Sequence, residues 1–369
     1  MAIQTIISGT GLYIPPDSIS NEELVSSFNH YVDDQNKQDT SIILQHSSAA
    51  FIEKASGILN RHVIDKTGIL DPQRMRPALP LRAEEECSIQ AEFACQAIQQ
   101  ALTQAQKSPE QVDGLIVSCV ALQRSYPGIA VEIQKRMGFT GYAFDMMAAC
   151  SSSTFGITTA VNAIANGQNN CIVVVNPELT SCHANFKDRD SHFIFGDACT
   201  ALVLERTSEN PPSETAFAIL GCQLKTNFSN NIRNNFGFLN HTETNTGEKT
   251  PHYLFQQNGR KVFKEVVPMV ETHIVAHLNQ FSMTPSDLKR YWLHQANINI
   301  NDLIIRKILG RAPQALEAPI ILDQLGNTAS CGSLIAFHQY HSDLKAGDLG
   351  LICSFGAGYS IGSILVRKT

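Results

Sequence analysis

The chain has 369 residues, of which 43% are hydrophobic and 17% charged, and its formal net charge is −6 at pH 7. This length suits two to three domains or one large two-lobed unit, and the weak negative charge argues against general binding to nucleic acid or membrane surfaces. No apolar run is long enough to cross a bilayer, and the first residues lack the pattern of a signal peptide. We therefore expect a cytoplasmic protein that binds neither nucleic acid nor membrane.

Ten cysteines are spread through apolar segments, and no two of them form a Cys-x-x-Cys motif. A cytosolic chain of this size does not need disulfide bonds, so we expect reduced thiols. His273 with His277 and His338 with His341 have helix-face spacing, but no ligand pattern of Cys or acidic residues accompanies them. We therefore predict no metal site.

Apolar runs alternate with long helical periodicities along the chain, which predicts an α/β fold with buried central sheets. The predicted strands, in chain order, cover residues 1–7, 115–118, 142–146, 171–175, 201–204, 291–293, 319–322, 350–353 and 363–366. The predicted helices cover residues 91–105, 155–164, 262–281, 303–309 and a small-residue segment from 329 to 333.

Residues 102–112 and 278–288 resemble each other, and they lie nearly half the chain length apart. In each segment a helix ends, Ser-Pro or Thr-Pro begins a new turn, where proline suits the first helical position, and an apolar strand follows. This duplication predicts two similar halves, 1–210 and 211–369. The polar, Pro-rich stretch 209–213 would join them.

Two polar segments interrupt the alternation of helices and strands. They are residues 31–47 and the Asn-rich residues 227–258. Long polar connections usually run over the surface and often border a functional site. We expect both segments to be excursions over the surface or over the mouth of the active site.

Cys150 lies between the predicted strand 142–146 and a predicted helix that contains Phe155 and Ile157. A thiol at such a turn faces the positive end of the helix dipole, which favours the thiolate, the nucleophilic form of cysteine. The position therefore indicates a nucleophile. A buried structural cysteine is the alternative, and it is the commonest role of this residue type.

Two further polar residues stand near predicted strand ends. His294 closes the strand 291–293, and Asn327 follows the predicted strand 319–322. Ligands of open α/β sheets bind beyond the carboxyl ends of the strands, so these side chains are candidates to meet Cys150. Taken singly, a packed histidine and a turn-forming asparagine are the ordinary alternatives. Together they suit thioester chemistry, in which a thiolate attacks and neutral N–H donors hold the resulting oxyanion.

A Gly-rich segment, 354–363, contains Gly356-Ala357-Gly358. It is followed by a strand and not by a helix, so it lacks the context of a dinucleotide-binding loop. Its backbone N–H groups would be able to approach a thioester carbonyl closely, because glycine permits such contact. A plain hairpin turn is the alternative.

These motifs resemble those of the β-ketoacyl-acyl carrier protein synthase III family, condensing enzymes of thiolase fold, over nearly the whole chain. His-Gln-Ala-Asn and Gly-Asn-Thr are specific for this family. The matching segments are residues 7–15, 148–150, 194–198, 293–297, 326–328 and 355–358. Residues 188–193 and 230–238 are most similar to the β-ketodecanoyl-carrier-protein synthase branch, which accepts medium-chain acyl-CoA. The resemblance implies a five-layer αβαβα fold with two pseudo-symmetric halves and central mixed sheets.

By this resemblance Cys150 takes an acyl group from acyl-CoA and passes it to the carbanion formed when malonyl-acyl carrier protein loses CO2. His294 and Asn327 would hold the malonyl thioester carbonyl. The N–H groups of Cys150 and Ala357 would form the second oxyanion hole. No cofactor is implied beyond the two substrates.

The resemblance also implies contacts to CoA and pantetheine from Phe51, Arg189, Lys264 and Asn297. Phe51 stands where a tryptophan is usual. Ala55 and Asn299 replace arginines of the family pattern, which puts the mode of CoA docking in doubt but not the chemistry.

Partner contacts follow from the same resemblance. Tyr126, before Pro127, stands where an aromatic residue closes the acyl pocket of the other subunit, which implies a homodimer; a packed aromatic is the alternative. Arg306 and Lys307 would receive an acidic acyl carrier protein, although as an isolated pair they fit a solvated helix face.

The sequence thus predicts an acyltransferase of fatty acid synthesis that condenses a medium-chain acyl-CoA with malonyl-acyl carrier protein. Alternatives are an acetyl-CoA-specific initiating synthase, a head-to-head acyl-CoA condensing enzyme, and an inactive scaffold partner. The last would be expected to lose Cys150, His294 or Asn327, and all three are present.

Overall fold

The computed structural model describes residues 4–39, 41, 43–207, 215–242 and 253–369. Nine strands of this described part form one mixed sheet in the order β11-β12-β13-β8-β1-β7-β6-β4-β5. In chain order they are β1 (Thr5–Tyr13), β4 (Gly114–Ser118), β5 (Tyr142–Met146), β6 (Cys171–Glu178), β7 (Ala198–Arg206), β8 (Phe217–Ser229), β11 (Arg290–Leu293), β12 (Leu349–Gly356) and β13 (Gly358–Lys368). Two short pairs lie outside it: β2 (Asp17–Ser20) with β3 (Asn60–Val63), and β9 (Ile232–Arg233) with β10 (Gln256–Gln257).

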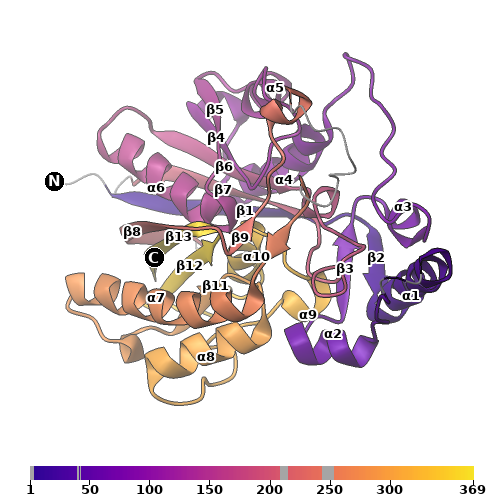
Figure 1. Cartoon of the computed structure of the whole chain (residues 1–369). Coiled ribbons are helices and arrows are strands. Elements are labelled where there is room, and N and C mark those ends of the chain that lie inside the picture. Colours follow the sequence, from indigo (N-terminus) through magenta and orange to yellow (C-terminus); the bar gives the residue numbers. More distant parts are fainter. Residues whose placement is uncertain (1–3, 40, 42, 208–214, 243–252) are drawn as a thin grey trace.

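The α-helices pack on both faces of the sheet (Figure 1). They are α1 (Asn21–Gln38), α2 (Ala49–Ser56), α3 (Lys66–Leu70), α4 (Ile89–Ala105), α5 (Ile129–Met137), α6 (Ser152–Ala165), α7 (Gly259–Gln280), α8 (Ile298–Leu309), α9 (Leu322–Leu325) and α10 (Cys331–Gln339).

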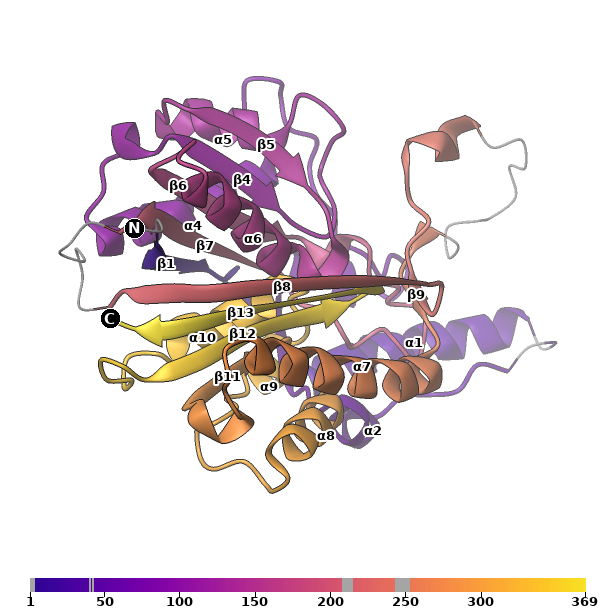
Figure 2. The same cartoon turned by 90° about the vertical axis from the view of Figure 1, so that its left-hand side faces the viewer.

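Helices and strands alternate in five layers. One core cluster packs α6 and α10 between the strands of the two halves, with Ile157 and Ile335 among its buried members. A second cluster packs α4 and α5 on the outer face of β4, β6 and β7, and a third packs α7 and α8 on β11, β12 and β13 (Figure 2). Each fully buried Leu, Ile or Val side chain contributes about 1.5–3 kcal/mol to this assembly. The arrangement confirms the predicted thiolase-like αβαβα fold.

The strands of the two halves meet where β1 pairs with β8, and the paired residues are Ile6 with Ala218 and Ile7 with Phe217. The internal duplication is visible in the elements themselves. Helix α4 is followed by a short 3-10 helix and β4, and α7 is followed by a short 3-10 helix and β11. Both 3-10 helices begin with a capping box, at Ser108 and at Thr284. The predicted junction 209–213 lies outside the described residues, so the division at residue 210 stays a prediction.

Two expectations need correction. Residues 319–321 are not a strand, because the N–H of Ile321 bonds to the side chain of Gln295 instead of a neighbouring strand, and α9 follows directly. An apolar run alone does not distinguish a buried strand from a buried connection. The expected excursion 31–47 begins as helix, since α1 continues to Gln38. The other expected excursion, 227–258, also contains regular structure, the end of β8 and the β9–β10 pair, and residues 234–242 after β9 project from the body of the molecule (Figure 2).

Among the described helices, none has both the length and the apolar character needed to span a bilayer.

Candidate active site

Cys150 lies in a single 3-10 turn, Ala149–Ser151, between β5 and α6. Ala149 has φ +48°, a left-handed conformation that costs a non-glycine residue about 1 kcal/mol or more. The Ser152 hydroxyl stabilises this turn, because its Oγ accepts from the N–H of Ala148 at 2.9 Å and donates to the carbonyl of Ala149 at 2.7 Å. The strained turn sets the direction of the cysteine side chain.

The turn between β12 and β13 closes over Cys150. The Ser151 hydroxyl donates to the carbonyl of Ser360 at 2.9 Å, and the Ser360 hydroxyl donates to the carbonyl of Ala148 at 3.1 Å. Gly356 lies directly against the cysteine. A Cβ atom at Gly356 would lie 2.6 Å from the Cβ and 2.9 Å from the Sγ of Cys150, so only glycine fits here.

A Gly356→Ala variant is therefore expected to displace the Cys150 side chain. We expect acylation of Cys150 to slow by about 100-fold, because displacing a reacting group by about 1 Å costs about that much. The rate is measured by mass spectrometry of the intact protein after mixing with acyl-CoA. Gly259→Ala, at the first residue of α7 with open space around it and no positive φ, is the control, and equal acylation of wild type and Gly356→Ala would contradict the expectation.

The thiol of Cys150 does not have the lowered pKa that its position predicts. Burial, with the charge of Glu178, raises the pKa of Cys150 to about 12, while hydrogen bonds from the N–H groups of Ala357 and Cys150 itself oppose this rise. The expectation of a favoured thiolate is thus wrong for this structure, because the lost hydration of a buried anion outweighs what the amides supply.

His294 follows β11 and is buried. Its N–H donates to the carbonyl of Cys353 at 2.8 Å, its carbonyl accepts from Asn301 Nδ2 at 2.8 Å, and its ring meets the ring of Phe355 edge-on at 5.2 Å. Burial lowers the pKa of His294 to about 4, although a backbone hydrogen bond with Ala329 opposes this shift. The imidazole is therefore neutral at pH 7, and its Nδ1 has no hydrogen-bond partner among the described residues.

Asn327 lies in the turn between α9 and α10 and is 6% exposed. Its N–H donates to the carbonyl of Ile194 at 2.8 Å, and its Oδ1 accepts from the N–H of Ala329 at 2.9 Å. Because the turn itself occupies Oδ1, the Nδ2 hydrogens are the part of the amide left for a ligand. Ala329 has φ +49°, so this turn is also strained, whereas glycine adopts the φ of +66° at Gly326 without strain.

Contacts join these three residues into one cluster. Cys150 touches Gly356, and the preceding residue, Phe355, touches the His294 ring. The backbone of Ala329 bonds to both His294 and Asn327. The folded chain thus links the thiol, the imidazole and the amide through two strained turns.

Glu178 is a residue that the sequence analysis missed. It ends β6, is 1% exposed, and acts on the pKa of Cys150. A charged residue at the end of the continuous apolar strand 171–178 was the available signal, since carboxylates are almost never fully buried without a partner or a role.

The predicted CoA contacts divide into separate groups. The guanidinium of Arg189 stacks on the ring of Phe51 at 4.1 Å, and its Nε donates to the carbonyl of His46 at 2.8 Å. Lys264 lies elsewhere, on α7, where it lines a cavity of about 540 Å³ with Phe228 and Tyr359. The structure brings Phe51 and Arg189 together.

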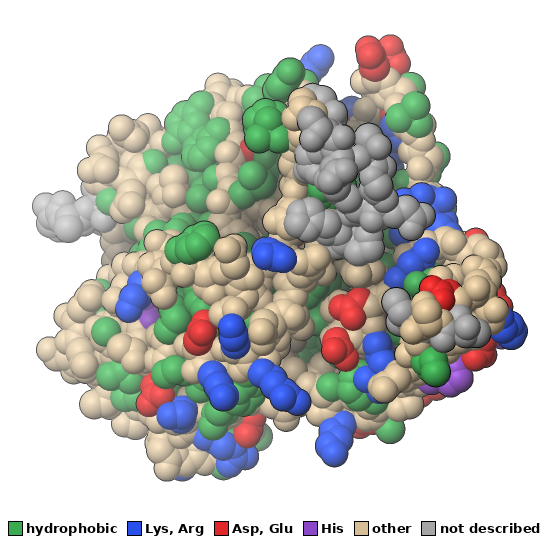
Figure 3. Space-filling model, in the orientation of Figure 1, with side chains coloured by type: hydrophobic (Ala, Val, Ile, Leu, Met, Phe, Trp, Pro, Cys, Tyr) green, Lys and Arg blue, Asp and Glu red, His purple; other side chains and the backbone are tan. Residues whose placement is uncertain are grey.

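The remaining predicted contact residues have partners within the chain. Asn297 caps α8 and donates from Nδ2 to the carbonyl of Ala55 at 2.7 Å. Arg306 pairs with Asp302 at 2.7 Å and Lys307 with Glu271 at 3.2 Å, so each cation is matched by an acid. Figure 3 shows several Lys and Arg side chains over α7 and α8. Tyr126 is 85% exposed.

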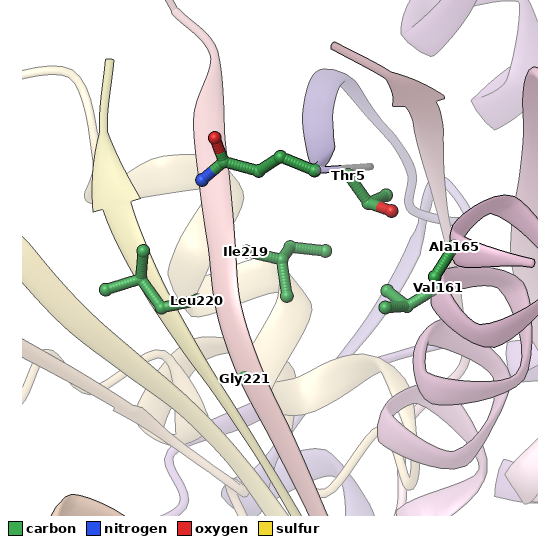
Figure 4. Close-up of a pocket in the computed structure, with 7 residues that line it drawn as sticks. Thr5, Val161, Ala165, Ile219, Leu220 and Gly221 are labelled. Carbon is green, nitrogen blue, oxygen red and sulfur yellow. The ribbon is translucent and has the colours of Figure 1, made fainter. Parts of the chain in front are cut away.

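A second cavity, of about 420 Å³, opens between α6 and β8 (Figure 4). Val161 and Ala165 line it from α6, and Ile219 and Leu220 line it from β8. None of its lining residues belongs to the predicted site, so we assign it no role.

The fold and the cysteine cluster define a thiolase-fold condensing enzyme. The structure of 3-oxoacyl-[acyl-carrier-protein] synthase III from Aquifex aeolicus shares this fold, with a TM-score of 0.76 and 24% identity over 98% of this chain and 99% of that chain. The family models for 3-oxoacyl-[acyl-carrier-protein] synthase III and for its C-terminal part match residues 144–227 and 278–368.

Two relatives in sequence extend this likeness. A β-ketodecanoyl-[acyl-carrier-protein] synthase from Pseudomonas aeruginosa is 53% identical over 352 residues, which cover 93% of this chain and 100% of that protein. A β-ketoacyl-[acyl-carrier-protein] synthase III from Symbiobacterium thermophilum is 31% identical over 286 residues, covering 75% of this chain and 83% of that protein. The chain belongs to the β-ketoacyl-[acyl-carrier-protein] synthase III family and is an acyltransferase of the condensing type.

Proposed function

We propose that the protein condenses a medium-chain acyl-CoA with malonyl-acyl carrier protein and releases 3-oxoacyl-acyl carrier protein, CoA and CO2. The main support is the geometry at Cys150, where the N–H groups of Ala357 and of Cys150 itself point at the sulfur. Two amides in that position suit the oxyanion of a thioester under attack. The P. aeruginosa relative, named for a β-ketodecanoyl product, favours a medium acyl chain.

In the first half-reaction the sulfur of Cys150 attacks the thioester carbonyl of acyl-CoA. The Sγ–C bond forms, the C–S bond to CoA breaks, and the thiol proton leaves with the CoA sulfur. Because the pKa of Cys150 is about 12, little thiolate exists at pH 7. The proton must therefore leave as attack proceeds, while the two amides stabilise the tetrahedral oxyanion.

In the second half-reaction the malonyl thioester loses CO2, and the electron pair of the broken C–C bond passes into an enolate. A neutral His294 and the Nδ2 group of Asn327 would donate hydrogen bonds to the enolate oxygen. The carbanion then attacks the acyl-Cys150 carbonyl, the C–C bond forms, and the cysteine sulfur leaves as a thiolate that takes a proton from water, which restores the thiol. Decarboxylation drives this step, so the reaction as written needs no cofactor.

CoA would enter past Phe51 and Arg189. The Arg189 guanidinium stacked on the Phe51 ring forms a flat, cationic surface suited to a nucleotide base and its phosphates. Lys264 and Asn297 would meet the pantetheine arm. Arg306 and Lys307 would bind acidic groups of the carrier protein. These groups must compete with Asp302 for Arg306 and with Glu271 for Lys307.

We also propose that the protein is a homodimer and that it is cytoplasmic. β5 is the edge strand of the sheet, and Tyr142, Phe144 and Met147 are 45%, 38% and 61% exposed. Figure 3 shows apolar side chains gathered over β5 and α6. An exposed apolar edge strand is normally covered, and a second copy would cover it and bring its Tyr126 to the acyl pocket.

A panel of acyl-CoA thioesters tests the proposed substrate. We expect octanoyl-CoA to acylate Cys150 at least about tenfold faster than acetyl-CoA, because each extra methylene in a fitted apolar pocket adds discrimination. Mass spectrometry of the Cys150 peptide measures the rates. Acetyl transfer without octanoyl transfer would reject the medium-chain choice in favour of an initiating synthase. Condensation of two acyl-CoA molecules without malonyl-carrier protein would favour a head-to-head enzyme.

A further inference from the structure

Glu178 is a buried carboxyl group without a counter-ion. Both of its oxygens accept from the N–H of Val120 at 3.1 Å. One of them, Oε1, also accepts from the N–H of Ser330 at 3.3 Å and from the Ser330 hydroxyl. No Lys or Arg pairs with it in the part of the chain that the structure describes.

These hydrogen bonds connect the two halves of the site. Val120 follows β4 in the first half, and Ser330 belongs to the same turn as Asn327 and Ala329. The N–H of Ala329 in turn donates to the side-chain Oδ1 of Asn327, and the backbone of Ala329 also bonds to His294. Glu178 therefore holds the turn 327–330. This turn carries the Asn327 amide, and its residue Ala329 bonds to His294.

Within the described ranges of the chain, no Lys or Arg forms an ion pair with Glu178 that would fix its ionisation. The groups that interact with it electrostatically are the carboxyl of Asp197 and four thiols, those of Cys119, Cys150, Cys199 and Cys331. A charge on Glu178 consequently acts on the Cys150 thiol without compensation.

We propose that Glu178 is a positioning residue of the active site, which clamps the turn 327–330 to the end of β4 and whose ionisation controls how readily Cys150 loses its proton. This inference rests on the proposed function only in the roles given to Cys150, His294 and Asn327. The clamp follows from the hydrogen bonds. The electrostatic control follows from the placement of Val120, which bonds to Glu178, directly after Cys119, whose carbonyl accepts from the Ser152 hydroxyl beside the Cys150 turn at 3.0 Å.

The direction of the control follows from the charges. Burial raises the pKa of Glu178 to about 7 and that of Asp197 to about 6. As the pH rises through 7, Glu178 becomes an anion and makes the loss of the Cys150 proton harder. Below that pH the carboxyl is neutral and does not oppose it. Cys150 reactivity should therefore rise with pH less steeply near pH 7 than a free thiol does.

Alkylation of Cys150 by iodoacetamide tests this control without any acyl substrate. We expect Glu178→Gln to alkylate about three to ten times faster than wild type at pH 8.5, since each pKa unit changes the thiolate fraction tenfold, and to lose the flattening near pH 7. Peptide mass spectrometry follows Cys150 and, as an internal control, the half-buried thiol of Cys87, whose charged neighbours are Arg136, Glu132, Glu92 and Arg82. Glu205→Gln is the matched variant, because Glu205 is also a buried carboxylate but pairs with Lys107 and lies beside Cys171 at the opposite end of β6.

The clamp predicts the opposite effect on condensation. A glutamine oxygen in the place of Oε1 keeps Ser330, but the NH2 group then faces the N–H of Val120 and the negative charge that strengthens these bonds is lost, so the 327–330 turn should loosen. We expect kcat for condensation to fall about tenfold with little change in KM, and Glu178→Asp to keep the pH dependence of alkylation. A faster alkylation joined to a slower condensation is not the signature of a general loss of stability.

Each outcome decides the inference. It is overturned if the Cys150 alkylation profiles of wild type and Glu178→Gln coincide, if Cys87 alkylation changes as much as that of Cys150, or if Glu205→Gln has the same effect as Glu178→Gln. If Glu178→Gln does not fold, the wild-type profile decides, because a constant tenfold rise per pH unit through pH 7 contradicts the control. Failure of acyl transfer with the expected alkylation pattern would reject the proposed function and leave this inference intact.

Discussion

Cys150→Ala is expected to lose acyl transfer by at least about 10³-fold, because it removes the thiol that the two backbone N–H groups of the site face. Wild type mixed with octanoyl-CoA should gain the mass of one octanoyl group, and the variant should gain none. The thiol is partly buried in a turn closed by Gly356, so a methyl group at this position should not disturb the fold. Mass spectrometry of the intact protein measures the result.

Cys182→Ala is the control for this experiment. Cys182 is an exposed thiol, and its removal should leave the rate and extent of acylation unchanged. An acylated Cys150→Ala protein, or an acyl group mapped to another cysteine, would show that the nucleophile has been assigned to the wrong residue.

His294→Ala and Asn327→Ala are expected to separate the two half-reactions. Each removes a hydrogen-bond donor to the enolate and should lower condensation by about 10²–10³-fold. Neither residue contacts the amides of Cys150 and Ala357, so acylation should change much less. Single-turnover acylation by octanoyl-CoA and formation of 3-oxoacyl-carrier protein are measured on the same samples.

Asn279→Ala, on the exposed face of α7, is the matched control and should leave both half-reactions unchanged. The pH dependence adds a second check. Because burial lowers the pKa of His294 to about 4, the imidazole stays neutral above about pH 5, and no inflection in condensation should come from this residue between pH 5.5 and 8. Complete loss of acylation in a folded His294→Ala or Asn327→Ala protein would contradict this division of roles.

Local sequence patterns were sufficient for the helices and strands that frame the site. Residues 142–146 form β5 as predicted, and the predicted helix 91–105 matches α4 closely. The repeated helix, Pro turn and strand appear in both halves with capping boxes at Ser108 and Thr284. Such features depend on side-chain periodicity and on short-range hydrogen bonds, which lie entirely within a few residues of sequence.

Other properties of the site depend on contacts between distant segments. Residues 319–321 are as apolar as a strand, but Gln295 and not a neighbouring strand receives the N–H of Ile321. Likewise, a solvated face and a basic docking patch look alike at Arg306 and Lys307 until Asp302 and Glu271 are placed beside them.

The sequence by itself determined the fold class, the family and the three residues of the proposed chemistry, because these are encoded by periodicity and by contiguous motifs. Only the tertiary structure decided the protonation of the site. The strand-to-helix position of Cys150 favours a thiolate, but burial and the charge of Glu178, which ends β6, raise its pKa to about 12. Desolvation and through-space charge depend on which segments pack together, and no local pattern records that.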